Sequence, residues 1–339
     1  YSVNDNGTQG GNYDNKGATG LNAIASGVDA KAGGDHATAM GHGATAGGHY
    51  AIAQGYQANA AGANGVAIGT QASAAKGGTV AIGASAGKDS TVLTGTFIGS
   101  GAGNKSAGAD ITAIGNNAGQ AASGNSNTFI GATAGSSSEG DLNSFIGAGA
   151  GIFSKGTANS AFGNLAGANT EGDSNAAWGF AAGAFVKGDG NIGMGTSAGA
   201  SVVGSGNAAI GQGAGLGTQG DANLAIGAGA GSIAKGNGNV ALGQNAGLAA
   251  DGNENIALGQ TAGALVSGNR NLAIGSAAGL AGDVAAGNIT PTTASDTIAL
   301  GTQAFANAER AIAIGAGAQA LGTQSISIGT GNVVNGNNS

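Results

Sequence analysis

The sequence contains no cysteine and only one proline, Pro291. Without thiols the chain can form no disulfide framework, no cysteine-based metal site and no thiolate nucleophile. Charged residues are also scarce, at 8%, and the formal net charge of −7 leaves no basic surface for nucleic acid. No apolar run approaches the roughly 18 residues that a membrane-spanning helix needs, so we expect no membrane contact by this segment.

The N-terminus lacks the features of a natural start. Residues Tyr1 to Asp5 include neither Met nor the basic and apolar regions of a signal peptide. We therefore interpret the sequence as a fragment of a longer chain.

Aromatic residues make up only 4% of the chain, whereas 74 of the 339 residues are glycine. This is roughly three times the usual glycine share of about 7%. Glycine loses much conformational entropy on folding, which disfavours an ordinary packed globule and leaves disorder as the simple alternative. A hydrophobic fraction of 41%, arranged at a fixed period, argues against disorder.

An internal repeat dominates the sequence. A bulky apolar residue, here called the anchor, recurs every 16 residues and is followed each time by Gly, with Ala four and Gly five places on. Ten successive repeats, from Asn127 to Asn271, also place Asn three residues before the anchor. The anchors are Ile82, Ile98, Ile114, Ile130, Ile146, Phe162, Trp178, Met194, Ile210, Ile226, Leu242, Leu258 and Ile274.

The flanks keep this motif at other spacings. Upstream, Ile24, Met40, Ile52 and Ile68 read as anchors at irregular intervals of 16, 12 and 16, with 14 to Ile82. Downstream the interval is 14, after a gap of 26 that contains Pro291. The sequence thus divides into an irregular start (1–20), irregular repeats (21–81), regular 16-residue repeats (82–281), an inserted loop (282–297) and 14-residue repeats (298–339).

A repeat of 16 residues is too short for helical repeats, which need 30 or more. One unit reads as a short alternating strand, such as Asn223 to Gly227, followed by an Ala-Gly segment and a turn. Two strands of about five residues and two turns complete a coil, and coils stack in parallel at about 4.8 Å per step. The predicted fold is all-β, a parallel β-solenoid of mostly 16-residue coils.

The alternation within a strand assigns its faces. The anchor and the residue two before it, as in Leu242 and Val240, share one face, and Ala and Gly occupy the other. A single coil encloses too little apolar core to offset an ordering cost of roughly 1–2 kcal/mol per residue. We therefore predict that identical chains associate side by side and share a core.

Stacking in phase also predicts ladders of like side chains. The asparagines should form an amide ladder with a structural role, ligand binding being the alternative, and Phe129 should stack on Phe145. In-phase charges of alternating sign should fix the register, as in Glu139, Lys155, Glu171 and Lys187, and Glu254 with Arg270. Threonine in phase at Thr112 and Thr128 is too sparse for an ice-binding face.

No catalytic, metal or cofactor site emerges, and we expect no enzyme. The histidines, His36, His42 and His49, read as surface polar residues; the alternative is a ring at an oligomer axis that binds a metal or an anion. The acidic residues follow Gly in repeat turns, which is ordinary turn chemistry. Hexapeptide-repeat acyltransferases have a period of 6, of which 16 is not a multiple.

Four segments resemble a known family: Asn223–Ala230, Ala311–Ala320, the opening Asp14–Ile24 and the closing Gly331–Ser339. They are similar to the YadA-like head repeats of trimeric autotransporter adhesins of Gram-negative bacteria. The resemblance implies a left-handed parallel β-roll, a homotrimer with a shared core, and display on the bacterial cell surface after export through the outer membrane. Because 14 residues are usual in this family, the extra two should broaden an outer edge around Ser154-Lys155-Gly156.

Two functions remain open. The first is an adhesin head that binds a host extracellular matrix protein, a cell-surface receptor or another surface. The second is a spacer or self-association module, acting in autoagglutination or biofilm, that extends a binding site elsewhere in the fibre. The candidate interaction loop is the segment that breaks the stack, with residues Gly282, Asp283, Asn288, Thr290, Pro291 and Thr292.

Overall fold

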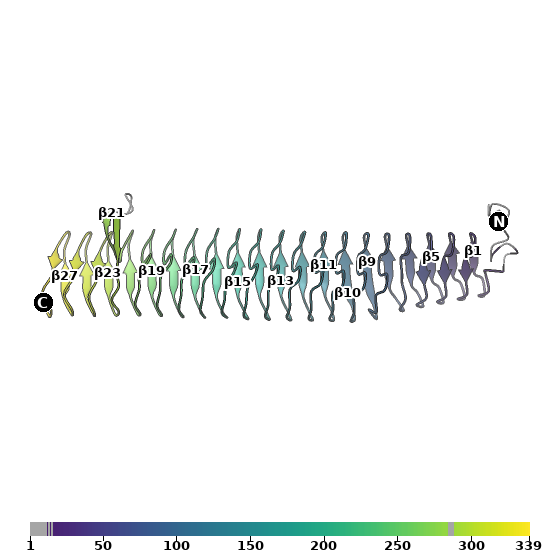
Figure 1. Ribbon diagram of the computed structural model, residues 1–339, viewed down its shortest axis with the longest axis horizontal. Helices are drawn as coiled ribbons and strands as arrows, with labels where there is room; N and C mark the ends of the chain where they lie inside the picture. The colour runs from purple at the N-terminus through teal and green to yellow at the C-terminus, as the bar shows by residue number, and fades with distance from the viewer. Residues whose placement is uncertain (1–11, 13, 15, 284–287) are drawn as a thin grey trace. The chain divides into compact units, whose positions relative to one another are not determined.

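The computed structural model describes residues 12, 14, 16–283 and 288–339, so residues 1–11, 13 and 15 of the predicted irregular start lie outside the described part. The chain divides into two compact units, Tyr1–Asn169 (unit 1) and Thr170–Ser339 (unit 2). Each unit is a parallel β-solenoid, and the described residues contain no helix, which confirms the predicted all-β class (Figure 1).

In unit 1, each coil contributes one short strand to a main parallel sheet. Its strands are β1 (Ile24–Ser26), β3 (Thr38–Met40), β5 (Ile52–Gln54), β7 (Val66–Ile68), β8 (Val80–Ile82), β9 (Gly95–Ile98), β10 (Ile111–Ile114), β11 (Thr128–Ile130), β12 (Ser144–Ile146) and β13 (Ser160–Phe162). A second sheet on the first coils consists of β2 (Lys31–Ala32), β4 (Thr45–Ala46) and β6 (Asn59–Ala60).

Unit 2 repeats this plan. Its main strands are β14 (Ala176–Trp178), β15 (Ile192–Met194), β16 (Ala208–Ile210), β17 (Leu224–Ile226), β18 (Val240–Leu242), β19 (Ile256–Leu258), β20 (Leu272–Ile274), β23 (Ile298–Leu300), β25 (Ile312–Ile314) and β27 (Ile326–Ile328). The second sheet is β24 (Phe305–Ala306), β26 (Gln319–Ala320) and β28 (Val333–Val334). Between them, β21 (Leu280–Asp283) and β22 (Asn288–Pro291) form an antiparallel hairpin.

The register corrects the period predicted for the first coils. Ser26 pairs with Met40, Met40 with Gln54, and Gln54 with Ile68, so the coils from β1 to β8 have a uniform period of 14. The irregular spacing of 16, 12 and 16 was wrong, because Ile24 and Ile52 occupy the first place of their three-residue strands and Met40 and Ile68 the third. The 16-residue period begins where Val80 pairs with Thr96.

The 14-residue coils have a second short strand, and in the 16-residue coils a longer irregular segment takes its place. In a 14-residue coil the buried residues Ala44 and Ala46 flank one outward residue of β4. In a 16-residue coil the corresponding buried residues, Ala230 and Ala234, are four apart, and the chain between them passes through positive φ at Ile233. Strands of five residues were therefore not found, and only single bridges, such as Lys235 with Asp251, join neighbouring coils on this side.

The predicted broad edge around Ser154 lies slightly too late in the chain. By the same comparison, the two added residues are Ile152 and Phe153. Ser154 itself is 2% exposed and donates a hydrogen bond to the carbonyl of Gly167. The added residues therefore protrude as an arch just before Ser154.

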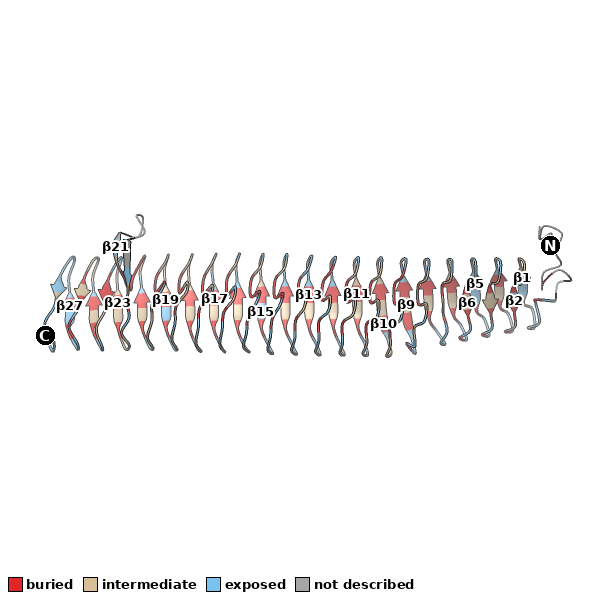
Figure 2. Cartoon of the chain, viewed as in Figure 1, coloured by how far each residue is buried: buried red, intermediate tan, exposed pale blue. Residues whose placement is uncertain are grey.

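Buried residues recur from coil to coil (Figure 2), and in most coils alanine makes up this core. The middle residue of the strand, such as Ala241, points inward and is 4% exposed. Its neighbours Val240 and Leu242 point outward and are half-buried, as the prediction that they share a face requires. The small core inside the coil thus leaves the large aliphatic side chains on the outer surface of the protomer.

We call the inward-pointing residue of each main strand the inner place. In three coils of unit 1 it is a phenylalanine, Phe97, Phe129 or Phe145, and each is at most 1% exposed. The predicted stacking of Phe129 on Phe145 is confirmed, with ring centroids 5.7 Å apart. Glycine makes room for each ring, since a Cβ at Gly135 would overlap the ring of Phe129. In one coil of unit 2 the large and small residues exchange positions. Gly193 occupies the inner place of the strand, and the valine Val202 on the opposite wall of the coil is buried there.

The glycine after the anchor allows backbone contact between coils. Gly227, which follows the anchor Ile226, has φ of +128°, and a Cβ there would lie 2.6 Å from the carbonyl oxygen of Gly243 in the next coil. No L-residue with a side chain fits both conditions. The invariant Gly of the repeat therefore follows from the spacing of the coils.

Replacing this glycine should be far more costly than replacing a glycine at a turn. Gly227→Ala is expected to lower the free energy of unfolding by more than about 2 kcal/mol, because it combines backbone strain with overlap. Gly213→Ala is the control, since a Cβ there meets nothing within 4 Å, and it should cost only about 1 kcal/mol for its positive φ. Urea unfolding of both variants measures the difference, and equal losses would contradict this account of the spacing.

Candidate interaction surfaces

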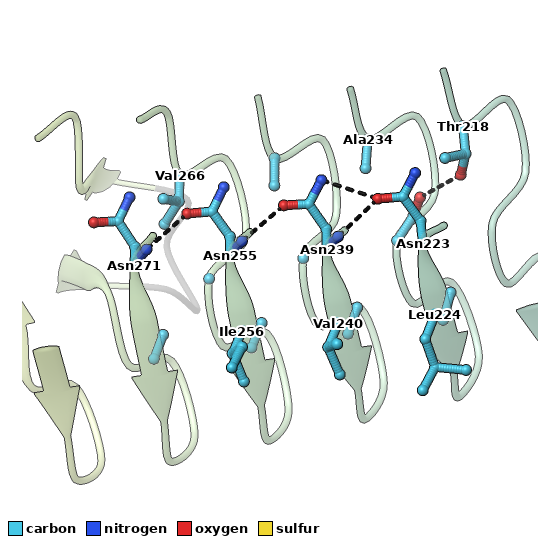
Figure 3. Close-up of a pocket in the computed structure, with 18 residues that line it drawn as sticks. Thr218, Asn223, Leu224, Ala234, Asn239, Val240, Asn255, Ile256, Val266 and Asn271 are labelled. Carbon is cyan, nitrogen blue, oxygen red and sulfur yellow. Dashed lines mark hydrogen bonds between the residues drawn. The ribbon is translucent and has the colours of Figure 1, made fainter. Parts of the chain in front are cut away.

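The asparagine ladder lies inside the coils (Figure 3). Asn223 and Asn239 are each 7% exposed. The backbone N–H of Asn239 donates to Oδ1 of Asn223 at 2.9 Å, and Nδ2 of Asn223 donates to the carbonyl of Gly236 at 2.9 Å. The backbone N–H of Asn223 in turn donates to Oδ1 of Asn207 at 3.0 Å, so the residue ties its own coil to both neighbours. This supports the structural role over ligand binding.

Removal of one rung should destabilise the fold strongly. Asn223→Ala would leave the N–H of Asn239 and the carbonyl of Gly236 without partners, at about 1–3 kcal/mol for each buried group. Asn237→Ala is the matched control, because Oδ1 of Asn237 accepts from the N–H of Asp221 on the exposed edge, where water can replace it. Thermal unfolding should show a large shift for the first variant and a small one for the second; similar shifts would argue against the buried ladder as the main tie.

The ladder borders a narrow apolar cavity of about 30 Å³ in unit 2, drawn in Figure 3. It lies in coils where alanine is the inward residue both on the strand and on the opposite wall, as with Ala225 and Ala234, or Ala241 and Ala250. About 15 Å³ already admits one water molecule, but an apolar cavity offers it no partners. The cavity is a packing gap, too small for an organic ligand.

The outward residues of the main strands form an apolar strand face on each unit. In unit 2, Ile210, Ile226 and Ile274 are each 38% exposed, and the first places of the strands hold Leu224, Val240, Ile256 and Leu272. Aliphatic side chains therefore lie side by side on successive coils. Contiguous apolar surface of this kind marks an interaction site in a soluble protein.

In unit 1 the strand face is partly polar. The first places pair in register as a ladder of hydroxyls, with the series Thr96, Thr112, Thr128, Ser144 and Ser160. The prediction that threonine is in phase only at Thr112 and Thr128 was wrong, because Thr96 pairs with Thr112. The anchors beside this ladder remain aliphatic or aromatic, so hydroxyls alternate with large apolar groups.

The predicted interaction loop is a hairpin that projects from the coils of unit 2 (Figure 1). Gly282 and Asp283 belong to β21, and Asn288, Thr290 and Pro291 to β22. Of the candidate residues, Gly282 and Thr290 are exposed. Residues 284–287, within the predicted loop, lie outside the described residues.

The loop is shorter than predicted. Thr292 is 1% exposed, and its hydroxyl donates to the carbonyl of Ala306 at 2.9 Å. It occupies the place of Val266 in the preceding coil, and residues 292–297 continue that coil to Thr297, which replaces the ladder asparagine and donates to Oδ1 of Asn271. Thr292 is therefore a core residue and offers no binding surface.

The in-phase charges occupy neighbouring coils, as Glu139 and Lys155 do at a backbone bridge. Arg270 instead forms a close ion pair with Asp296 across the hairpin insertion, with Nε and Oδ1 2.6 Å apart and a second bond of 3.0 Å. The expected partner Glu254 acts on Arg270 only at longer range. Hydrogen bonding to Arg270 lowers the pKa of the Asp296 carboxyl.

This ion pair predicts a pH-dependent contribution to stability. Because the pKa of Asp296 is lower in the folded state than its unfolded value of about 3.9, its stabilisation is complete above that pH and is lost as the pH falls through the folded pKa. Asp296→Asn should lower the Tm at pH 7 and have little effect near pH 2. In an Arg270→Gln background most of this pH-dependent effect should disappear, leaving only the weaker attraction of Arg310 for Asp296. An undiminished effect would refute the assignment.

The three histidines lie exposed at turns of unit 1, each beside a residue of a neighbouring coil. His36 stacks on Tyr50 with ring centroids 5.0 Å apart, and His42 stacks on Tyr56 at 5.4 Å. Nδ1 of His49 lies 3.5 Å from a carboxylate oxygen of Asp35. Among the described residues, no group of three His, Asp or Glu side chains is placed to hold a metal ion. These contacts favour surface roles.

Comparison with protein families finds the YadA head domain repeat in residues 18–44, 46–72, 60–86, 293–318 and 320–339. These segments carry the 14-residue coils, and the 16-residue coils lie between them. No curated protein matches the chain. In the part of the chain that the structure describes, no apolar helix of membrane-spanning length is present. Both ends of the chain are thus built from YadA-type head repeats.

Proposed function

We propose that this chain, which carries the head repeats of a YadA-like trimeric autotransporter adhesin, is a bacterial surface head that attaches the cell to host cells, extracellular matrix or other surfaces. The observation that carries the proposal is the YadA head repeat at both ends, in register with a β-solenoid. The head acts by binding and not by catalysis, and it belongs to a protein anchored in the outer membrane.

Three copies of the chain associate through the strand face. The inside of most coils is filled by alanine, which buries little apolar area, while Ile226 and its neighbours expose larger side chains on the surface. Burial of these side chains against other copies supplies the apolar core that one coil lacks, at about 25 cal/mol per Å². The family supports the number three.

A charge on this face should therefore prevent assembly. Ile226→Lys would place an ammonium group in the shared core, and sedimentation velocity should show dissociation or unfolding. Ser232→Lys, on the arch of the same coil, is the control and should leave the oligomer intact. A monomeric wild-type protein, or an Ile226→Lys variant that assembles normally, would overturn this arrangement.

The hairpin is the candidate attachment element. It is the insertion that interrupts the 16-residue period, and Gly282 and Thr290 are exposed on it. Deletion of residues 282–291 joins Ala281 to Thr292 and restores a 16-residue coil, so the variant should fold. Solid-phase binding to collagen, fibronectin, laminin and polystyrene should fall at least tenfold in this variant; unchanged binding would remove the hairpin from the site.

The second candidate function is a spacer or self-association module. The asparagine ladder supports this function. The same hydrogen bond joins one coil to the next, so further coils of the same design would lengthen a fibre without adding a binding site. An intact trimer that binds none of the matrix proteins or surfaces, yet promotes agglutination of cells that display it, would favour this function over direct attachment.

A further inference from the structure

A shallow groove of about 490 Å³ runs along one exposed corner of unit 2. Such a volume lies within the range of roughly 300–1,000 Å³ typical of ligand sites. The residue two places before each main strand lies at this corner. It is small in two coils, Ala222 and Gly238, and long in the next two, Glu254 and Arg270, which leaves the groove between them. We call it the corner groove, and an outer row of Asn237, Asn253 and Asn269 lines it.

The three asparagines are held in one orientation. Oδ1 of Asn253 accepts the N–H of Asn237 at 2.8 Å, and Oδ1 of Asn269 accepts the N–H of Asn253 at 2.8 Å. Within the described residues, the amide nitrogens of Asn237 and Asn269 donate no hydrogen bond, and that of Asn253 makes one of 3.2 Å. Since an amide nitrogen carries two N–H groups, each of the three asparagines keeps at least one without a protein acceptor among the described residues, one amide per coil.

The backbone of the groove is already satisfied. The N–H groups of Gly238, Glu254 and Arg270 donate to carbonyls of the preceding coil. A peptide cannot add here as a strand, and the lining has no large apolar residue to receive its side chains. Recognition must come from side-chain amides, one carboxylate and one guanidinium, which are planar groups that bind hydroxyls.

The charge of the groove disfavours an anionic ligand. Arg270 is already paired with Asp296, so the carboxylate of Glu254 leaves a net negative charge beside the asparagines. The rows repeat at about 4.8 Å, which is close to the length of one sugar unit in an extended chain. Each sugar of a polysaccharide that follows the stack would therefore meet one asparagine.

We propose that the corner groove binds a neutral, hydroxyl-rich polysaccharide that lies along the coils, with its hydroxyls bonded to the amides of Asn237, Asn253 and Asn269. This inference gives the attachment function a class of ligand and rests on that proposed function. The groove is polar and separate from the apolar strand face, so assembly through that face leaves its chemistry unused.

Two substitutions test the groove without disturbing the coil. Gly238→Tyr fills it, and the fold accepts a large residue with positive φ at this corner, as Tyr50 and Leu142 show. Asn253→Asp removes the donor but keeps the acceptor for Asn237, as Asp221 does for Ser205. The matched controls are Gly190→Tyr, at the same corner outside the groove, where a Cβ meets nothing within 4 Å, and Asn125→Asp in unit 1.

The whole chain is titrated with neutral hexaoses (cellohexaose, hexa-N-acetylchitohexaose, maltohexaose and laminarihexaose), with a hyaluronan hexasaccharide and with gelatin, by saturation-transfer NMR and calorimetry. We expect at least one neutral hexaose to bind, Asn253→Asp to weaken it at least tenfold, Gly238→Tyr to abolish it, and the controls to leave it unchanged. Binding of none of the neutral sugars, of hyaluronan or gelatin alone, or equal binding by Gly238→Tyr would overturn the inference.

The same samples separate this inference from the proposed function. If matrix proteins bind wild type and Gly238→Tyr equally and no neutral sugar binds, the attachment function stands and the sugar site is excluded. If an intact oligomer binds neither sugars nor matrix proteins nor polystyrene, the attachment function fails as well.

Discussion

Backbone stacking at one coil per step is the constraint on which this structure depends. The coils approach so closely that the residue after the anchor must lack a Cβ, as Gly227 does. Each inner asparagine also bonds to both neighbouring coils, as Asn223 does with Asn207 and Asn239. Once those two positions are fixed, the remaining positions are free to vary by coil. Phenylalanine, alanine and glycine all occupy the inner place, provided that the residues around it adjust in volume.

Much of the fold was predictable from the sequence, because in a solenoid residues one repeat apart lie on neighbouring coils and contact each other. Residues 16 apart must touch, and so the Phe129–Phe145 stack and the asparagine ladder followed from counting. The period of the first coils was misread for a local reason. Ile24 and Ile52 have the character of anchors but stand one alternation earlier, and an isoleucine does not reveal which outward place of a three-residue strand it fills.

Other features could not be read from the sequence. Alternation shows that Val240 and Leu242 share a face, but not whether that face is inside or outside. In the structure Ala241 points inward and the two larger residues point outward, because the narrow interior of this coil has room for alanine. The hairpin was visible only as a gap, because its antiparallel pairing obeys no repeat. The corner groove was invisible, since it arises from missing side chains at Ala222 and Gly238 and from the turn that brings them into one row.

The hydrogen bonds between coils join residues mostly 13 to 17 positions apart, as from Asn223 to Gly236 or from Gly238 to Asp221. Each new coil therefore needs only the preceding one as a template, and folding can propagate along the chain instead of waiting for distant segments to meet. A polypeptide released end first into solution could fold at the rate at which it emerges. The part that has already folded would then prevent the emerging chain from sliding back.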